Sequence, residues 1–261
     1  MNEEIVFSTR ALSVGYRGKA LVRDIDIDLR RGQILSLIGP NGAGKSTILK
    51  TITGQIPPIS GTTVIEGKSI TAWPRGELAR KMAVVLTDRI RPEMMTCFDV
   101  AAMGRYPYTG RFGSLTDNDR AIVHATLRRV RADDLADRDF SQISDGQRQR
   151  IMLARALCQE PEVIVLDEPT SYLDIRHKAE LLDILSEEAR AQQRVVVMSM
   201  HEISLAEEAS DLIMTVHSDG HVRVGKPAEM LSETDIAALF DMDLNSRAVR
   251  RFWTHMRHGD S

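Results

Sequence analysis

One nine-residue stretch, GPNGAGKST (Gly39–Thr47), constrains the fold of this chain more than any other feature. It fits the pattern G-x-x-x-x-G-K-[S/T], and it stands between the apolar run QILSLI and the segment KSTILKTIT, which Gly54 closes. A strand, a glycine-rich turn and a helix in that order are the setting in which this motif binds nucleotide phosphates. Backbone N–H groups of the turn surround the phosphates, and the helix N-terminus adds partial positive charge. The sequence therefore predicts an α/β fold built around a phosphate-binding loop.

The residue types in the loop predict how it holds a nucleotide. Lys45 is expected to reach the β- and γ-phosphates, and the Ser46 hydroxyl is expected to ligate Mg²⁺. The loop residues predicted to bind the nucleotide are Gly39, Pro40, Asn41, Gly42, Ala43, Gly44, Lys45, Ser46 and Thr47.

Two further apolar runs end in residues that suit a phosphate-transfer site. VIVLDE ends in Asp167, which is expected to join the Mg²⁺ ligands, and in Glu168, which can orient or deprotonate a water aimed at the γ-phosphate. Ligands of α/β sheets bind at the carboxyl ends of the strands, where these acids are predicted to lie. SMHE places His201 at the end of the next strand, where a hydrogen bond to the γ-phosphate is expected. Five further histidines show no metal-ligand spacing and are expected at the surface: His177, His217, His221, His255 and His258.

The segment SDGQ, from Ser144 to Gln147, predicts a helix start that is polar throughout its first turn. Ser144 would cap the helix, and Gln147 would reach back to the cap residue three positions earlier. This capping box is a sufficient local reason for the helix to begin here, but it assigns no ligand to the polar end.

Hydrophobic periodicity predicts how the rest of the chain is organised. Strict alternation from Val22 to Leu29 predicts a half-exposed antiparallel strand, and GTTVIEGKSI predicts a hairpin around Glu66 and Gly67. Residues 104–119 are expected to form a Pro/Gly/Tyr-rich loop, followed by a helix from about 119 to 131. Strands alternating with helices on both sides of this region predict an α/β protein with an inserted helical subdomain.

Composition is that of a water-soluble globular protein, with 43% hydrophobic and 27% charged residues. The net charge of -3 gives no reason to expect nucleic acid as a partner. Cys97 and Cys158 form no CxxC pair and are expected to be buried and reduced. The first residues lack the apolar run of a signal peptide, and no run reaches the roughly 18 apolar residues of a membrane span.

The four motifs, in their order along the chain, resemble those of the ATP-binding cassette (ABC) family. They are GPNGAGKST, ISDGQRQRIMLARAL, VIVLDEPTSYLD and SMHE. The resemblance implies ATP as the nucleotide and a single nucleotide-binding domain over residues 1–261. It also implies a P-loop NTPase fold, with a RecA-like core sheet and an antiparallel β-subdomain at about 1–87 and 158–225. The helical subdomain would cover about 88–157, and a C-terminal extension about 226–261.

In that family two cassettes sandwich two ATP molecules. By resemblance, the signature residues of one cassette would contact the ATP bound by its partner; they are Ser144, Asp145, Gly146 and Gln147. Asp174 in SYLD matches the D-loop, which crosses the interface between cassettes. Tyr16 matches the aromatic position that stacks on adenine.

Two positions depart from the family pattern. Asp145 replaces the first glycine of LSGGQ. At about 8 Å and an effective dielectric constant of about 20, its repulsion of a γ-phosphate would cost on the order of 2 kcal/mol. Its side chain is therefore expected to point away or to pair with Arg148 or Arg150. The family's Mg²⁺-sensing glutamine is also replaced. Thr87 stands at its position, followed by Asp88, and either residue could offer a side-chain oxygen to the Mg²⁺ site in its place.

Within the family, GRYPYTGRFGSLTDND and TSYLDIRHKAELLDIL resemble the ATPase subunits of importers for ferric siderophores, haem and cobalamin. This resemblance implies a homodimer on the cytoplasmic face of the membrane, bound to two copies of a polytopic permease. A separate substrate-binding protein would act on the other side of the membrane, and no nucleic acid would be involved. Residues 88–112, with Met94, Met95 and Phe98, would face the permease.

Two alternatives remain open at this point. A soluble ABC ATPase with a non-transport task, such as iron–sulfur cluster assembly, has the same architecture. A small-molecule P-loop kinase would need an acceptor pocket and a lid, and it would not account for SDGQ and SYLD together.

Overall fold

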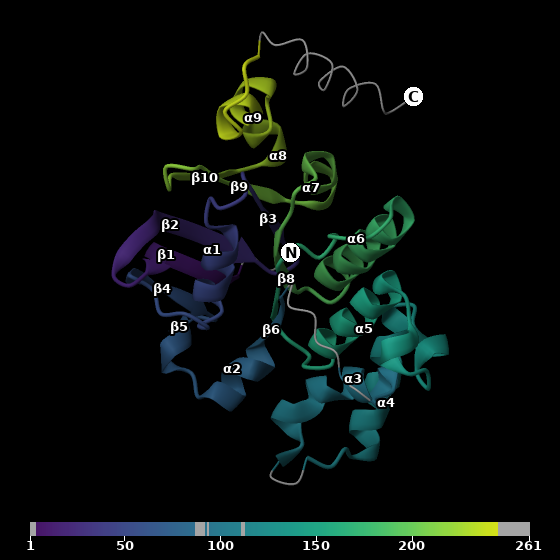
Figure 1. Ribbon diagram of the computed structural model, residues 1–261. Helices are drawn as coiled ribbons and strands as arrows, with labels where there is room; N and C mark the ends of the chain where they lie inside the picture. Colours follow the sequence, from purple (N-terminus) through teal and green to yellow (C-terminus); the bar gives the residue numbers. More distant parts are fainter. Residues whose placement is uncertain (1–3, 87–91, 93, 111–112, 245–261) are drawn as a thin grey trace.

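Two β-sheets and a lobe of helices make up the part of the chain that the computed structural model describes, residues 4–86, 92, 94–110 and 113–244 (Figure 1). The larger sheet has the strand order β10-β9-β3-β8-β7-β6, and all neighbouring pairs are parallel except β10 and β9. Its strands are β3 (Ile34–Ile38), β6 (Met82–Val85), β7 (Val163–Leu166), β8 (Val195–Ser199), β9 (Leu212–Val216) and β10 (Val222–Gly225).

The smaller sheet is antiparallel, with the order β2-β1-β4-β5. Its strands are β1 (Ile5–Tyr16), β2 (Lys19–Arg30), β4 (Ser60–Ile65) and β5 (Lys68–Ser69). The predicted alternation is confirmed, because Val22, Ile25, Ile27 and Leu29 of β2 are buried while the acidic residues between them are exposed. The predicted hairpin is confirmed as well, since β4 and β5 pair on either side of Glu66 and Gly67.

Both faces of the larger sheet are covered along β3, β7 and β8, which explains why nearly every position of these strands is apolar. Along β7, Val163 and Val165 belong to the hydrophobic cluster shared with the smaller sheet and α1 (Lys45–Ile52). Ile164 and Leu166 point to the opposite face and pack in the cluster of the helices. This sheet therefore lies in the middle of the molecule, between two hydrophobic cores.

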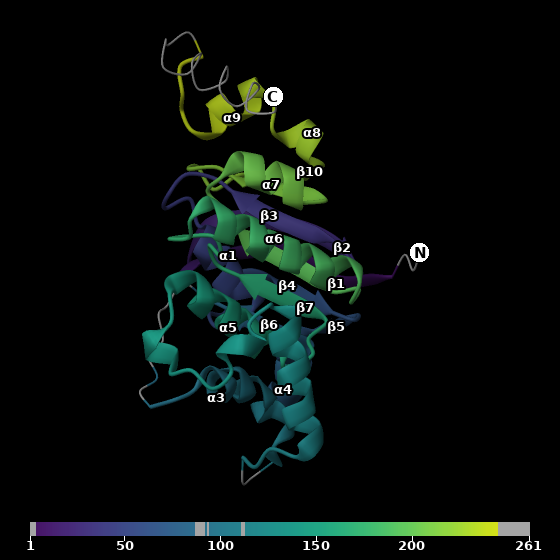
Figure 2. The ribbon, with the colours of Figure 1, turned by 90° about the vertical axis from the view of Figure 1, so that its right-hand side faces the viewer.

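The predicted alternation of strands and helices on both sides of the helical lobe is confirmed. The helices in this alternation include α1, which ends just before Gly54, then α6 (Ile175–Arg190) and α7 (Ile203–Ala209). A segment between β5 and β6 for which the patterns predicted no element forms η1 (Ile70–Ala72) and α2 (Arg75–Lys81). The short helices α8 (Pro227–Met230) and α9 (Glu233–Leu239) lie at the end of the molecule opposite the helical lobe (Figures 1 and 2).

The helical lobe consists of α3 (Cys97–Ala102), η2 (Met103–Tyr108), α4 (Asp117–Arg129), η4 (Asp133–Leu135), η5 (Phe140–Gln142) and α5 (Asp145–Leu157). The predicted helix over 119–131 is therefore two residues too late. Thr116 and Asp119 form a capping box that starts α4 earlier. The expected loop at 104–119 is wrong in its first part, because Met103–Tyr108 forms a 3₁₀ helix.

Both cysteines are buried and unpaired, as predicted. Burial raises the pKa of Cys158 to about 11. Within the described ranges, no helix combines the length and apolar character needed to cross a membrane.

The lobe contains a buried cation that joins three of its segments. Arg105 of η2 is 3% exposed. Its guanidinium donates to Asp119 Oδ1 at 2.9 Å, to the Cys158 carbonyl at 2.7 Å and to Glu160 Oε2 at 2.7 Å. The ring of Tyr108 covers the same guanidinium, with its centroid 3.9 Å away. Arg105 therefore connects η2 with the start of α4 and the end of α5.

We predict that Arg105→Met lowers the free energy of unfolding by about 3 kcal/mol, because removing one partner of a buried ion pair leaves the other charge uncompensated. Urea unfolding followed by circular dichroism measures the change. Arg176→Ala is the control. Its salt bridge to Glu180 is exposed and should be worth less than about 0.5 kcal/mol. Equal losses in the two variants would contradict the role assigned to Arg105.

Candidate nucleotide-binding site

The predicted phosphate-binding loop joins β3 to α1 and packs closely on both sheets. Gly44, the cap residue of α1, has φ 110°, a conformation that L side chains rarely adopt. A Cβ atom there would also lie 2.9 Å from Val22 Cγ2. At Gly39 a Cβ atom would lie 2.2 Å from the carbonyl oxygen of Val216. The glycines of the motif therefore let the loop turn tightly against β2 and β9.

Lys45 is 6% exposed and is held inside the loop. Its Nζ donates to the carbonyl oxygens of Gly39 at 2.7 Å and Pro40 at 3.1 Å. Burial lowers the pKa of Lys45, and the nearby carboxylates of Glu168 and Asp167 oppose that shift. The ammonium group is thus fixed at the mouth of α1, where the helix N-terminus also favours an anion.

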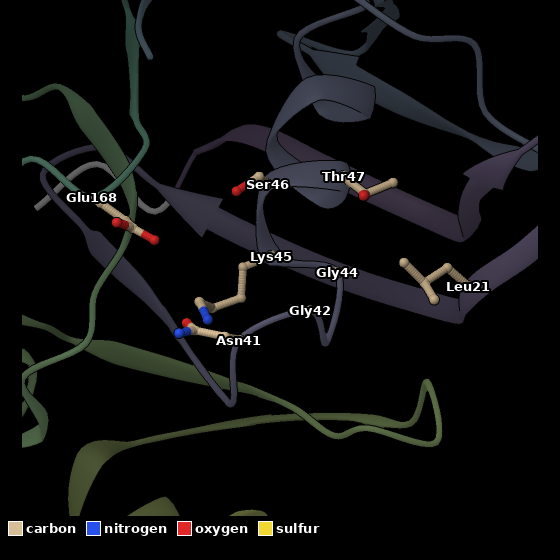
Figure 3. A pocket seen from close by; sticks show the side chains of 8 residues that line it. All are labelled: Leu21, Asn41, Gly42, Gly44, Lys45, Ser46, Thr47 and Glu168. Carbon is tan, nitrogen blue, oxygen red and sulfur yellow. The ribbon is translucent and has the colours of Figure 1, made fainter. Parts of the chain in front are cut away.

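A cavity of about 160 Å³ opens over this loop (Figure 3). It is lined by Leu21, Asn41, Gly42, Gly44, Lys45, Ser46, Thr47 and Glu168. In the close view the side chains of Lys45 and Glu168 extend into the same space. Ala43 does not line the cavity, because its side chain is buried in the hydrophobic cluster beneath the loop.

The side chains predicted to hold Mg²⁺ lie together at the edge of this cavity. Ser46 Oγ is 3.2 Å from Asp167 Oδ1, although the two residues come from α1 and the end of β7. A hydroxyl and a carboxylate are hard oxygen donors, the kind that Mg²⁺ prefers, and it often takes further oxygens from substrate phosphates. The residues present therefore fit this ion.

Glu168 and His201 are also brought together. His201 Nε2 lies 2.6 Å from Glu168 Oε1, and Ser171 Oγ donates to Glu168 Oε2 at 3.0 Å. Because β7 and β8 are parallel neighbours, both residues follow the carboxyl ends of their strands. The carboxylate and the imidazole thus lie side by side next to the phosphate-binding loop.

Tyr16 lies at the other side of the loop. Its side chain is 53% exposed, and its hydroxyl is 3.4 Å from Thr47 Oγ1. With the proline-containing segment 56–59 it lines a second cavity, of about 530 Å³. An exposed ring in this place is compatible with stacking on a nucleobase.

The polar start of α5 is built as the sequence predicts. Gln147 N donates to Ser144 Oγ at 3.3 Å, and Ser144 N donates to Gln147 Oε1 at 3.0 Å. Asp145 pairs with Arg148 at 2.7 Å, which confirms the first of the two predicted cations. Arg150 instead donates to the carbonyl oxygen of Arg131.

Among the described residues, none of the predicted signature residues lines the cavity over the loop. The start of α5 is in contact with a different motif. A Cβ atom on Gly146 would lie 2.8 Å from Cδ2 of His177, in the first turn of α6.

His177 is the residue that sequence reasoning missed, since it was expected at the surface with no role. Its side chain is 32% exposed, and Nδ1 lies 2.8 Å from Asp174 Oδ1. Asp174 also caps α6 by accepting the His177 backbone N–H at 2.9 Å, and these bonds lower the pKa of Asp174. An aspartate three residues before a histidine at a helix start was the available signal. His177 thus connects the predicted D-loop residue with the predicted signature glycine of the same chain.

The two candidates for the missing glutamine, Thr87 and Asp88, lie outside the described residues.

Relatives with curated names are similar over most of this chain. An uncharacterised ABC transporter ATP-binding protein of Methanocaldococcus jannaschii is 43% identical over 237 residues, which cover 91% of this chain and 82% of that protein. The iron(3+)-hydroxamate import ATP-binding protein of Bacillus subtilis is 34% identical, covering 90% and 88%. The hemin import ATP-binding protein of Streptomyces coelicolor is 33% identical, covering 91% and 84%.

Solved structures show the same fold. A chain from an inward-facing metal-chelate type ABC transporter matches with a TM-score of 0.81 and 27% identity, over 91% of this chain and 90% of that one. An ATP-binding cassette solved as a dimer with ADP and phosphate matches with a TM-score of 0.72 and 24% identity, over 85% and 98%.

The family model described as "ABC transporter" matches residues 22–171, which include the phosphate-binding loop, the start of α5 and the acidic end of β7. The chain therefore belongs to the ABC transporter family, as an ATP-binding cassette that hydrolyses ATP to power transport.

Proposed function

We propose that this cassette drives an importer of the ferric siderophore, haem or cobalamin type, through a separate membrane permease. The proposal rests chiefly on two relatives of similar length. One is the import ATP-binding protein for an iron(3+) hydroxamate, and the other is the import ATP-binding protein for hemin. The fold match to a chain of a metal-chelate type transporter supports the same substrate class. The cassette would lie on the cytoplasmic face of the membrane, bound to the permease.

The contacts around the loop support a role for each residue in hydrolysis. Lys45 would bind the β- and γ-phosphates, and Ser46 and Asp167 would ligate Mg²⁺. When bound, Mg²⁺ neutralises charge on the phosphate oxygens. Glu168 would orient or deprotonate the attacking water. His201, which is hydrogen-bonded to Glu168 in the structure, would donate a hydrogen bond to the γ-phosphate. Tyr16 would stack on the adenine ring.

A second copy of the cassette would complete each ATP site. Ser144, Gly146 and the N-terminus of α5 would bind the γ-phosphate held by the partner, since a capped helix start still offers N–H groups and partial positive charge to an anion. The absence of signature residues from the loop cavity, within the described part of the chain, supports this arrangement. Asp174 would lie at the interface between the two copies.

A groove on the helical lobe would receive the permease. A cavity of about 240 Å³ is lined by Met95, Asp99, Ala102, Met103, Tyr106, Thr109, Gly113 and Leu115. Next to it, Met94 is 94% exposed and the Tyr106 side chain is 78% exposed. Exposed apolar side chains around a groove are typical of a protein-binding surface, and a cytoplasmic helix of the permease would fit it. Most of these residues fall in the segment 88–112, which was expected to face the permease, and Gly113 and Leu115 lie just beyond it.

We predict that Glu168→Gln still binds ATP but hydrolyses it at least about a hundredfold more slowly, because an amide cannot take a proton from water. The variant should accumulate an ATP-bound dimer, seen by size-exclusion chromatography with ATP. Lys45→Ala is the companion variant, and it should lose nucleotide affinity instead. Normal turnover in Glu168→Gln would remove the role assigned to that carboxylate.

The Asp145–Arg148 pair determines the effect that we expect from substituting the unusual signature residue. Because Arg148 offsets the charge of Asp145, we expect Asp145→Gly alone to alter turnover less than threefold. Arg148→Ala should slow turnover by about tenfold, since it exposes the phosphate to an unpaired carboxylate. The double variant, Asp145→Gly with Arg148→Ala, should hydrolyse ATP at nearly the rate of the unaltered protein.

Two measurements test this double-mutant cycle. Steady-state ATPase rates are compared with Glu168 intact, and ATP-dependent dimer formation is compared in the Glu168→Gln background. Arg176→Ala serves as a surface control. If the double variant is as slow as Arg148→Ala, the loss comes from the contacts of Arg148 with the Ser141 and Ile143 carbonyls and not from electrostatics.

We predict that the tagged cassette co-purifies with a polytopic permease from membranes solubilised in mild detergent. Met94→Asp combined with Tyr106→Asp should reduce the recovered permease at least about tenfold, because a charge in an apolar interface is costly. The ATPase rate of the isolated cassette should not change. Val224→Asp, on an exposed apolar residue of β10, is the matched control. Recovery of a soluble complex with no membrane protein would contradict the proposed binding to a permease.

A further inference from the structure

A buried hydroxyl lies behind the two acidic residues of the site. Ser199, the last residue of β8, has no exposed surface. Its Oγ donates to Asp167 Oδ1 at 2.7 Å and accepts the backbone N–H of Glu168 at 2.8 Å. One side chain thus binds both acidic residues that directly follow β7, although the comparisons and motifs assign it no role.

The bond to Glu168 fixes an unusual backbone conformation. Glu168 has φ 50°, in the left-handed region that residues other than glycine rarely adopt. Such a conformation persists where the surroundings hold it, and it is found preferentially at functional sites. The turn takes the chain out of the strand direction, and the Glu168 side chain lines the cavity over the loop. The Ser199 hydroxyl holds the amide on which this turn depends.

The bond to Asp167 fixes the carboxylate from behind. Two hydroxyls meet the same oxygen atom, Oδ1: Ser46 Oγ at 3.2 Å from the phosphate-binding loop, and Ser199 Oγ at 2.7 Å from β8. Hydrogen bonds to a ligating carboxylate set its orientation, and their loss weakens metal binding.

We propose that Ser199 is a positioning residue that holds the Mg²⁺ ligand Asp167 and the water-activating Glu168 in a fixed relation. It acts through these two residues and touches neither the nucleotide nor the metal. This inference rests on the roles that the proposed function gives to Asp167 and Glu168.

A buried serine could also serve only to fill the sheet, and the chain offers a matched control. Ser36 lies in the neighbouring strand β3 and is likewise without exposed surface. Its hydroxyl accepts from Ser210 Oγ at 2.7 Å and lies 3.5 Å from the sulfur of Met200. It has no bond to either acid among those of the described residues. Ser36→Ala therefore removes the same atom from the same sheet without touching the site.

The test compares Ser199→Ala with Ser36→Ala in the full-length cassette. Ser199→Ala should raise the Mg²⁺ concentration for half-maximal ATPase activity by about tenfold and lower kcat by about tenfold. The Kd for ATP measured without Mg²⁺ should stay within twofold of the unaltered protein, which also shows that the variant is folded. Ser36→Ala should leave all three quantities unchanged.

A binding measurement removes the dependence on turnover. In the Glu168→Gln background with ATP, Mn²⁺ titrated by electron paramagnetic resonance should bind about tenfold more weakly when Ser199→Ala is added. Ser199→Thr and Ser199→Val form a second pair with nearly the same shape, of which only threonine keeps a hydroxyl. Threonine should retain Mn²⁺ affinity and valine should lose it.

Three outcomes would overturn the proposal. The Mg²⁺ and Mn²⁺ dependence could be unchanged in Ser199→Ala, or Ser36→Ala could lose as much metal affinity and kcat as Ser199→Ala. The third is that the threonine and valine variants bind Mn²⁺ equally well. Asp167→Asn separates this failure from a failure of the proposed site. If Asp167→Asn weakens Mn²⁺ binding and Ser199→Ala does not, only the role of Ser199 is wrong. If Asp167→Asn has no effect either, the metal ligands themselves have been assigned wrongly.

Discussion

The pairing of β3, β8 and β7 in one parallel sheet is the constraint on which the site depends. In this register Leu37 lies beside Ser199, and Leu166 lies beside Met198, so the three strands end at nearly the same level. The loop before α1, the acids after β7 and the histidine after β8 therefore meet at one edge. A slip of one residue would also turn each strand's side chains to the opposite hydrophobic core. The packing of two cores thus fixes the geometry of the site.

Much of the fold could be predicted, because its signals are local. The phosphate-binding loop, the alternating strand β2 and the capping box at Ser144 each depend on residues within a few positions of one another. The strand ends could also be predicted, since apolar runs that stop at polar residues mark the edge of a parallel sheet.

The parts that could not be predicted depend on contacts between distant segments. The 3₁₀ helix at Met103–Tyr108 carries a glycine and a proline, which are typical of a loop, and Arg105 holds it through Asp119 of α4 and residues just after α5. The position of His177 beside Gly146 depends on how α5 and α6 pack. The bridging role proposed for Ser199 has no local signal either, because a serine in an apolar strand has no distinctive pattern.

The polar contacts inside the helical lobe differ from those at its edge. Its interior contains the buried guanidinium of Arg105, whose bonds tie three segments into one unit. Its border with α6 is a row of mostly exposed pairs, in which Arg131 faces Asp183 and Glu187 with half-exposed side chains. Such pairs contribute little free energy and exchange readily with water. Glu188, which is buried at this border, pairs with Arg194 at 2.7 Å and with Arg129 at 3.5 Å. The segments of the lobe are thus held to one another by a buried cation, whereas the ion pairs that line its border with α6 are mostly exposed and add little to its attachment there.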